Sequence, residues 1–216
     1  MNPITRTLAL AAASVNGVCL SQAGPTGAGN LTINGGKATA GVAKFDAARR
    51  VLFTPAGAEA TNTTIWTVYG TNRSGAAISE VVNGVNNPTT VGTNQDFLTV
   101  SRIAVNKTQA GNIQVGTSGI ASTNWVMQNN ATTPQNTGIQ VVVSGTINYT
   151  IEYTYTDPNT LAIGSYPQIF ALASMTSQTA TLDGTITTPV WGVRLTQNSF
   201  TNPGSATMTV IQSGIG

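Results

Sequence analysis

Few side chains in this sequence could do acid–base chemistry. Histidine is absent and Cys19 is the single cysteine, which excludes Ser-His-Asp and Cys-His arrangements and removes the usual zinc ligands. A glycosidase needs two carboxylates facing each other across a cleft, and an EF-hand needs several within one short loop. The seven carboxylates show no such motif: Asp46, Glu59, Glu80, Asp96, Glu152, Asp157 and Asp183. We therefore expect no enzyme, and assign no catalytic, cofactor-binding or metal-binding residue.

Two further motifs bear on phosphate and nucleic-acid binding. The glycine-rich segment from Gly24 to Gly29 lacks the lysine and the following helix of a phosphate-binding loop, so we interpret it as a turn. The basic pair Arg49-Arg50 directly precedes the apolar run 51–53 and indicates a strand-edge or interface pair. Nine Lys/Arg against seven Asp/Glu give a net charge of +2, too weak and scattered for a nucleic-acid footprint.

The three tryptophans could instead form a sugar-binding platform. Trp66 alternates with Val68 and is expected on a core face. Trp125 precedes Val126 and Met127, and Trp191 follows Pro189 and Val190. For each tryptophan we favour core or interface anchoring, because large aromatic rings dominate both kinds of contact. Glycan stacking at Trp125 or Trp191 is the alternative, and would make the chain a receptor-binding module.

The composition predicts an unusual surface. Only 7% of the residues are charged, against about 25% in an ordinary domain, while 40% are hydrophobic. Short uncharged side chains lose little rotamer entropy when covered, and few ions need desolvating. Such a surface suits permanent contacts, although a secreted β-protein with an uncharged polar coat is an alternative. Cys19, between Val18 and Leu20, is expected to be buried and inert.

No segment predicts a membrane anchor or a leader. No apolar run approaches the ~18 residues of a membrane span. The apolar stretch after Arg6 is short and its preceding segment is barely charged, so we interpret it as structure and not as a signal peptide. We expect no membrane partner.

Period-2 alternation dominates the chain and predicts strands. Residues 147–155 place Ile and Tyr on one face and Asn, Thr and Glu on the other, ending at the turn residues Asp157-Pro158-Asn159. Residues 139–143 precede them, and Ser144-Gly145 between the two runs predicts a hairpin. A second hairpin is expected from 65–69 and 78–82. Further strands are expected at 31–34, 41–45, 50–54, 97–105, 112–115, 125–128, 169–175, 180–186, 190–196 and 206–211.

These strands predict an all-β, antiparallel fold: a β-sandwich, a jelly-roll-like fold or a barrel, with an extended N-terminal arm. The best helix candidate is Thr5 to Ala13, and a further turn is expected at Asn202-Pro203-Gly204. We expect three parts: an N-terminal arm over 1–29, a main β domain over 30–157 and a C-terminal β extension or small subdomain over 158–216. We also expect the arm to reach onto a neighbouring subunit and to be dispensable for folding.

Several stretches of the sequence are similar to sequences found in one group of proteins. They are Asn30 to Gly35, Arg49 to Gly57, Val68 to Gly75 with Ile78 to Glu80, Thr93 to Phe97 with Val100, and Gly138 to Tyr153 with Asp157-Pro158. Over residues 30 to 158 the chain resembles β-rich structural proteins of tailed-phage virions. Residues 159–216 carry no such likeness. The resemblance includes no catalytic motif and implies a place in the virion after assembly in the host cytoplasm.

Within such a particle, two roles are open. A capsid decoration (cement) protein fits the length, the neutral surface and the lack of helices. It would act as a homo-oligomer, possibly a trimer, bound to the major capsid protein or to other virion proteins. A tail-associated protein, such as a tube, adaptor or fibre-base subunit, fits as well. The absence of short β-repeats and heptads argues against a fibre shaft. We favour the decoration role.

Overall fold

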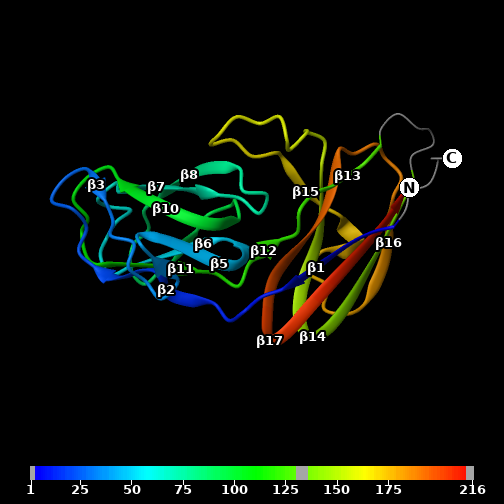
Figure 1. Cartoon of the computed structure of the whole chain (residues 1–216), viewed down its shortest axis with the longest axis horizontal. Helices are drawn as coiled ribbons and strands as arrows, with labels where there is room; N and C mark the ends of the chain where they lie inside the picture. Colours follow the sequence, from blue (N-terminus) through cyan, green and yellow to red (C-terminus); the bar gives the residue numbers. More distant parts are fainter. Residues whose placement is uncertain (1–2, 130–135, 213–216) are drawn as a thin grey trace. The chain divides into compact units, whose positions relative to one another are not determined.

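The chain folds almost entirely into antiparallel β-structure. The computed structural model describes residues 3–129 and 136–212, without the side chain of Asn202. Strands make up 57% of the structure and helix 1%, with curled sheets, which confirms the predicted all-β class. No helix in these described ranges is long and apolar enough to cross a membrane. The chain divides into two compact units, each described separately (Figure 1).

Unit 2 comprises Ala13–Ser118 and Ile163–Ser165. It contains two sheets, ordered β4-β5-β10-β7-β8 (with β3 also pairing with β10) and β2-β11-β6-β9. Their strands are β2 (Ser14–Gln22), β3 (Gly29–Asn30), β4 (Ala38–Thr39), β5 (Val42–Arg49), β6 (Val51–Pro55), β7 (Ile65–Thr71), β8 (Ala77–Asn83), β9 (Val91–Gly92), β10 (Phe97–Val105) and β11 (Ile113–Thr117). Only Arg50 separates β5 from β6, so the chain changes sheets there.

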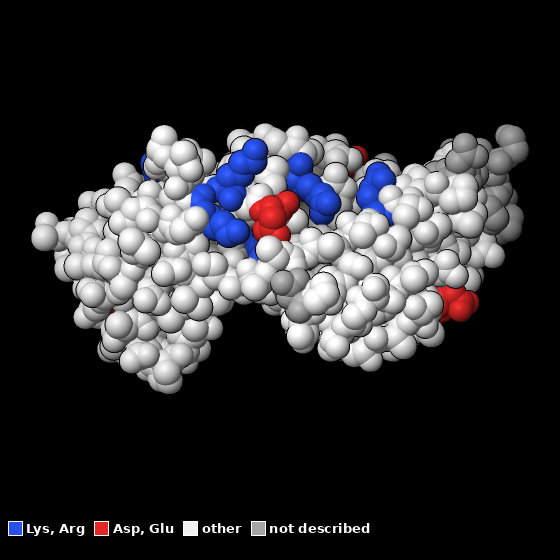
Figure 2. Space-filling model, turned by 60° about the horizontal axis from the view of Figure 1, so that its bottom comes forward, with Lys and Arg blue, Asp and Glu red and all other residues white. Residues whose placement is uncertain are grey.

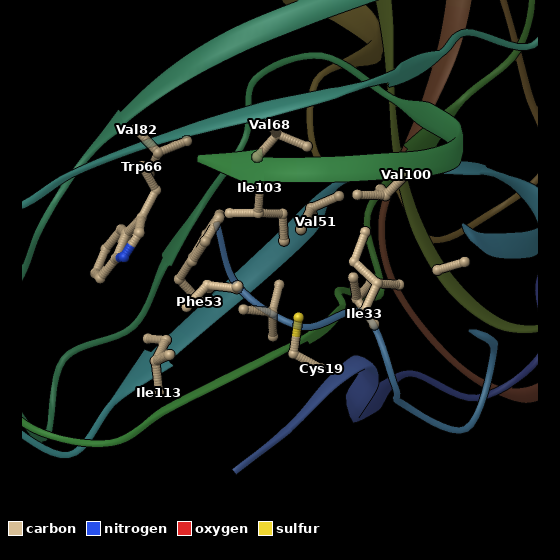
Figure 3. Close-up of a cluster of buried hydrophobic side chains, with 14 of the residues drawn as sticks. Cys19, Ile33, Val51, Phe53, Trp66, Val68, Val82, Val100, Ile103 and Ile113 are labelled. Carbon is tan, nitrogen blue, oxygen red and sulfur yellow. The ribbon is translucent and has the colours of Figure 1, made fainter. Parts of the chain in front are cut away.

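The core of unit 2 is built by alternate residues of both sheets. Phe53 from β6 stacks on Trp66 from β7, with ring centroids 4.7 Å apart. Both rings are fully buried, as are Cys19 and Ile103 (Figure 3). The predicted hairpin from 65–69 and 78–82 is confirmed, because β7 pairs with β8 from Ile65↔Asn83 to Thr71↔Ala77. This core makes unit 2 a packed β-domain in its own right.

The other unit, unit 1, comprises Met1–Ala12, Gly119–Ala162 and Tyr166–Gly216. Its sheet is organised around two long antiparallel strands, which pair from Thr137↔Gln212 to Thr154↔Gly192. Shorter segments flank this pair and complete the sheet. The elements are β1 (Ile4–Ala9), β12 (Ala121–Ser122), β13 (Val126–Met127), β14 (Thr137–Thr154), β15 (Ile169–Ala171), the 3-10 turn η1 (Ala173–Met175), β16 (Leu182–Ile186) and β17 (Gly192–Gln212).

The long strands correct two sequence predictions. The hairpin predicted at Ser144-Gly145 and the turn predicted at Asn202-Pro203-Gly204 are wrong, because β14 and β17 each run through these residues. Gly145 has φ +75° and pairs with Gly204, and a Cβ on Gly145 would lie 2.3 Å from the carbonyl oxygen of Pro203. The two turn-like segments therefore lie opposite each other as an irregularity in one ladder, where glycine permits the close approach.

The N-terminal predictions also need correction. Thr5 to Ala13 is not a helix, because β1 pairs with β17 from Ile4↔Val210 to Ala9↔Ser205. Residues 1–29 do not form a separate arm either: β1 lies in unit 1, whereas β2 pairs with β11 in unit 2 and buries Val18 and Cys19. The predicted parts 1–29, 30–157 and 158–216 thus differ from the observed units, because strands distant in sequence share a sheet.

Candidate interaction surface

Glu80 in β8 holds in place the loop that contains Asn94 and Gln95. Its carboxylate accepts hydrogen bonds from the backbone N–H groups of Asn94 (2.7 Å) and Gln95 (2.8 Å). The Gln95 side chain donates back to the carbonyl of Ser79. The residue is 6% exposed. A carboxylate occupied by two backbone donors serves structure, because both donors would otherwise be left unsatisfied.

Glu59 is fully buried and has a similar role. Its carboxylate accepts hydrogen bonds from the Thr64 hydroxyl at 2.6 Å and from the backbone N–H of Gly111 at 3.0 Å. Thr64 is itself buried. A substrate could reach this buried carboxylate only if the segments that contain Thr64 and Gly111 moved away from it.

The other carboxylates of unit 2 pair with the basic residues Arg49 and Arg50. Asp46 accepts a hydrogen bond from Arg49 at 2.6 Å, and Asp96 lies 3.9 Å from Arg50. Burial lowers the pKa of Arg49, and Asp46 partly offsets that effect. The basic pair is thus held at the junction of β5 and β6, and does not form a free phosphate clamp.

A polar network lies on β14 and β17 of unit 1. Glu152 accepts hydrogen bonds from Arg194 and from the Thr196 hydroxyl, both at 2.7 Å. The guanidinium of Arg194 lies 4.7 Å from the centre of the Trp125 ring. Glu152 is thus occupied by two donors of its own sheet, which leaves it poorly placed for acid–base chemistry. The last two carboxylates are a turn cap at Asp157, whose side chain accepts from the Asn159 N–H, and the exposed Asp183.

The three tryptophans occupy different environments. Trp66 is fully buried in the core of unit 2, which confirms the core interpretation. Trp125 is half-buried beneath the contact with Arg194, and Trp191 is 43% exposed. The structure therefore does not bring the tryptophans together into one platform, since Trp66 belongs to unit 2 and the other two to unit 1.

Cys19 is buried as predicted. Burial raises the pKa of its thiol to about 12. The thiolate is the reactive form of cysteine, so a thiol with this pKa is inert at neutral pH.

A broad uncharged surface lies on one side of the unit 1 sheet. Cross-strand partners point to the same side, so the pairings define two rows: Thr5–Thr209–Gln140–Asp183 and Thr7–Thr207–Val142. The Thr5 and Thr209 hydroxyls lie 3.3 Å apart and those of Thr7 and Thr207 3.0 Å apart. We call these seven residues the threonine face.

The two sides of this sheet differ sharply. Alternate residues such as Val141, Met208 and Val210 are fully buried on the inner side. On the threonine face, Val142 is 48% exposed, and Asp183 is its one charged residue. Charged side chains are likewise sparse on the side of the molecule drawn in Figure 2. Local sequence patterns do not reveal this face, because β1 and β17 are some 200 residues apart.

Within residues 3–129 and 136–212, no group of three His, Cys, Asp or Glu side chains is placed to hold a metal ion. No protein-family model and no curated protein matches the sequence.

Proposed function

We propose that this chain is a non-enzymatic structural protein of a tailed-phage virion, and that it acts there as a capsid decoration (cement) protein. The observation that carries the proposal is the threonine face: an ordered sheet surface of mostly short side chains with Asp183 as its one charge, in a chain whose carboxylates mostly hold its own loops and strands. The resemblance of residues 30–158 to phage structural proteins is the reason for proposing a phage virion as the assembly to which the chain belongs.

The physical basis is the low cost of covering such a surface. Thr and Val lose less rotamer entropy on immobilisation than Lys or Glu, and no unpaired ion must be desolvated apart from Asp183. Each Å² of apolar surface covered contributes about 25 cal/mol before the costs of association. Many symmetric copies then act together, so a modest contact per copy can reinforce a shell.

In this account the chain forms a homo-oligomer, possibly a trimer, and binds the major capsid protein or another virion protein. It binds neither nucleic acid nor membrane, needs no cofactor, and resides in the virion after assembly in the host cytoplasm. Attachment to the tail instead of the capsid would use the same kind of surface.

One observation favours a second candidate function, binding of a host glycan. Trp191 exposes 43% of its surface, and Trp125 carries the charged Arg194–Glu152 pair beside its ring. Aromatic rings next to hydrogen-bonding groups suit sugar recognition. Binding to a glycan array that is lost in Trp191→Ala would support this candidate over a purely structural role.

The test of the main proposal is rebinding to particles that lack the protein. We expect the purified chain to co-sediment with them at saturation. Val142→Arg on the threonine face should reduce occupancy at least tenfold. Val81→Arg is the matched control, because Val81 is 61% exposed on β8 of unit 2. Failure of the wild-type chain to associate with particles, or equal binding of both variants, would contradict the proposal.

A further inference from the structure

The outer strand of the unit 1 sheet presents an open edge. In the described part of the chain β1 pairs with one strand, β17. Four of its six residues are exposed. It contains no proline or glycine, two residue types that interrupt strand pairing. Arg6 is its one charged residue, so charge protects this edge at a single position. Unpaired N–H and C=O groups along such an edge can accept another strand.

The other long edge strands among the described residues are protected. The outer side of β2 receives backbone hydrogen bonds from Gly35, Gly36 and Lys37. β8 is covered by the loop that Glu80 and Gln95 hold in place. β16, at the opposite edge of the unit 1 sheet, has five residues and includes Asp183 and Gly184. The remaining edge strands are only two or three residues long. Strand addition is therefore focused on β1.

The composition of β1 is compatible with a second copy of the chain as the partner, and for that pair it determines the register. An antiparallel pair of β1 strands that continues both faces of the sheet must pair residues of the same parity. Centring the two-fold axis on Arg6 would place two arginines directly opposite each other, which is destabilising. Centring it on Thr7 pairs five residues of each copy, sets each Arg6 opposite an apolar Leu8, and places the two Thr7 side chains together.

We propose that two copies of this chain associate through their β1 strands, antiparallel about a two-fold axis at Thr7. The contact joins two seven-stranded sheets and extends the row of threonine hydroxyls from β17 through β1 into the second copy. The paired segment is roughly 17 Å long, so the contact falls short of the roughly 1,200 Å² typical of stable complexes. The dimer is accordingly weak in solution and gains strength where many copies are held close together.

Single cysteine substitutions in the full-length chain test the register. In the proposed dimer the two Cα atoms at position 7 lie roughly 5 Å apart, within disulfide range. The two Cα atoms at position 5 lie roughly 13 Å apart, beyond that range. Thr7→Cys should therefore form a covalent dimer under mild oxidation at least ten times faster than Thr5→Cys. The two sites are both exposed, lie on one face and lose equivalent hydroxyl contacts. Wild-type chain controls for Cys19, which is buried.

Two results would overturn the inference. One is a Thr7→Cys crosslinking rate no greater than that of Thr5→Cys. The other is a wild-type chain that sediments as a monomer at every concentration up to about the millimolar range, where contacts of this size should associate. The particle-binding experiment is independent of both. A chain that crosslinks at position 7 but does not bind particles would refute the proposed function alone, and the reverse pattern would refute only the dimer.

Discussion

The two units of this protein treat their sheet edges in opposite ways. In unit 2 the long edge strands are covered: β2 by the 35–37 segment and β8 by the loop bound to Glu80. In unit 1 the edge strand β1 is open, and the sheet beside it exposes an uncharged face. A low charge content thus has two consequences in one chain. In unit 2 the few carboxylates hold loops in place, and in unit 1 the threonine face carries a single charge, Asp183, and so is available for contact.

The strongest test of the comparison is N-terminal truncation. Deleting residues 1–22 removes β2 together with Val18 and Cys19 from the core of unit 2, so we expect unit 2 to unfold. Hydrogen–deuterium exchange at β11, the partner of β2, should become fast. Deleting only residues 1–9 removes β1 from unit 1 and should leave Cys19 protected from thiol reagents. Retained protection of β11 in the longer deletion would show that unit 2 does not depend on its N-terminal strand.

The next largest effect is expected for Trp66 in unit 2. Trp66→Ala removes a fully buried ring that stacks on Phe53 and should lower the free energy of unfolding by about 3–5 kcal/mol. Trp191→Ala in unit 1 is the matched control and should cost less than about 1 kcal/mol, because that ring is 43% exposed. Urea denaturation measures both, and equal losses would refute the assignment of Trp66 to the core.

A smaller effect is expected where Glu80 holds the loop over β8. Glu80→Ala leaves the N–H groups of Asn94 and Gln95 without their acceptor and should cost about 2–3 kcal/mol. Asp183→Ala removes an exposed carboxylate in unit 1 and should change stability by less than about 0.5 kcal/mol. A Glu80→Ala variant as stable as wild type would show that the loop needs no such anchor.

The remaining prediction concerns Cys19, and its effect is absent at neutral pH and develops only in alkaline solution. Burial raises the pKa of this thiol from 9.0 to about 12, so the folded protein favours the neutral form. The contribution of the neutral Cys19 thiol to the free energy of unfolding is fully present below pH 9. It is lost as the pH rises from 9 toward 12, at up to about 1.4 kcal/mol per pH unit, because the thiol ionises in the unfolded chain before it ionises in the folded one. The stability difference between wild type and Cys19→Ala should therefore shrink over this range. Parallel pH profiles for the two proteins would contradict the burial of the thiol.

Local pattern predicted the fold class but not the connectivity. The alternation over 65–69 and 78–82 was enough for the β7–β8 hairpin, because its turn residues lie within one short segment. Ser144-Gly145 carries equally good turn residues, yet β14 continues through them, since its pairing with β17 resumes on the other side. The helix candidate at 5–13 forms no helix for the same reason: a distant partner decides the conformation of β1.

The threonine face could not be predicted from the sequence, because its residues come from strands that are far apart along the chain. Thr5 and Thr7 alternate as they should in a strand, and so do Thr207 and Thr209, but only the fold places the two pairs side by side. The sequence did predict the buried Trp66, which lies within an apolar alternation, and the buried Cys19, which lies between two apolar neighbours. It could not show that Glu59 and Glu80 hold loops, since their backbone partners are at least 14 residues away.

The most direct test of the central claim is to locate this chain in an intact particle by cryo-electron microscopy. If the chain is a decoration protein, we expect its density on the capsid lattice, at threefold or quasi-threefold positions, with the threonine face covered by a neighbouring subunit. Density confined to the tail would contradict the decoration role. Density on the capsid with the threonine face open to solvent would contradict the assignment of that face as the contact surface.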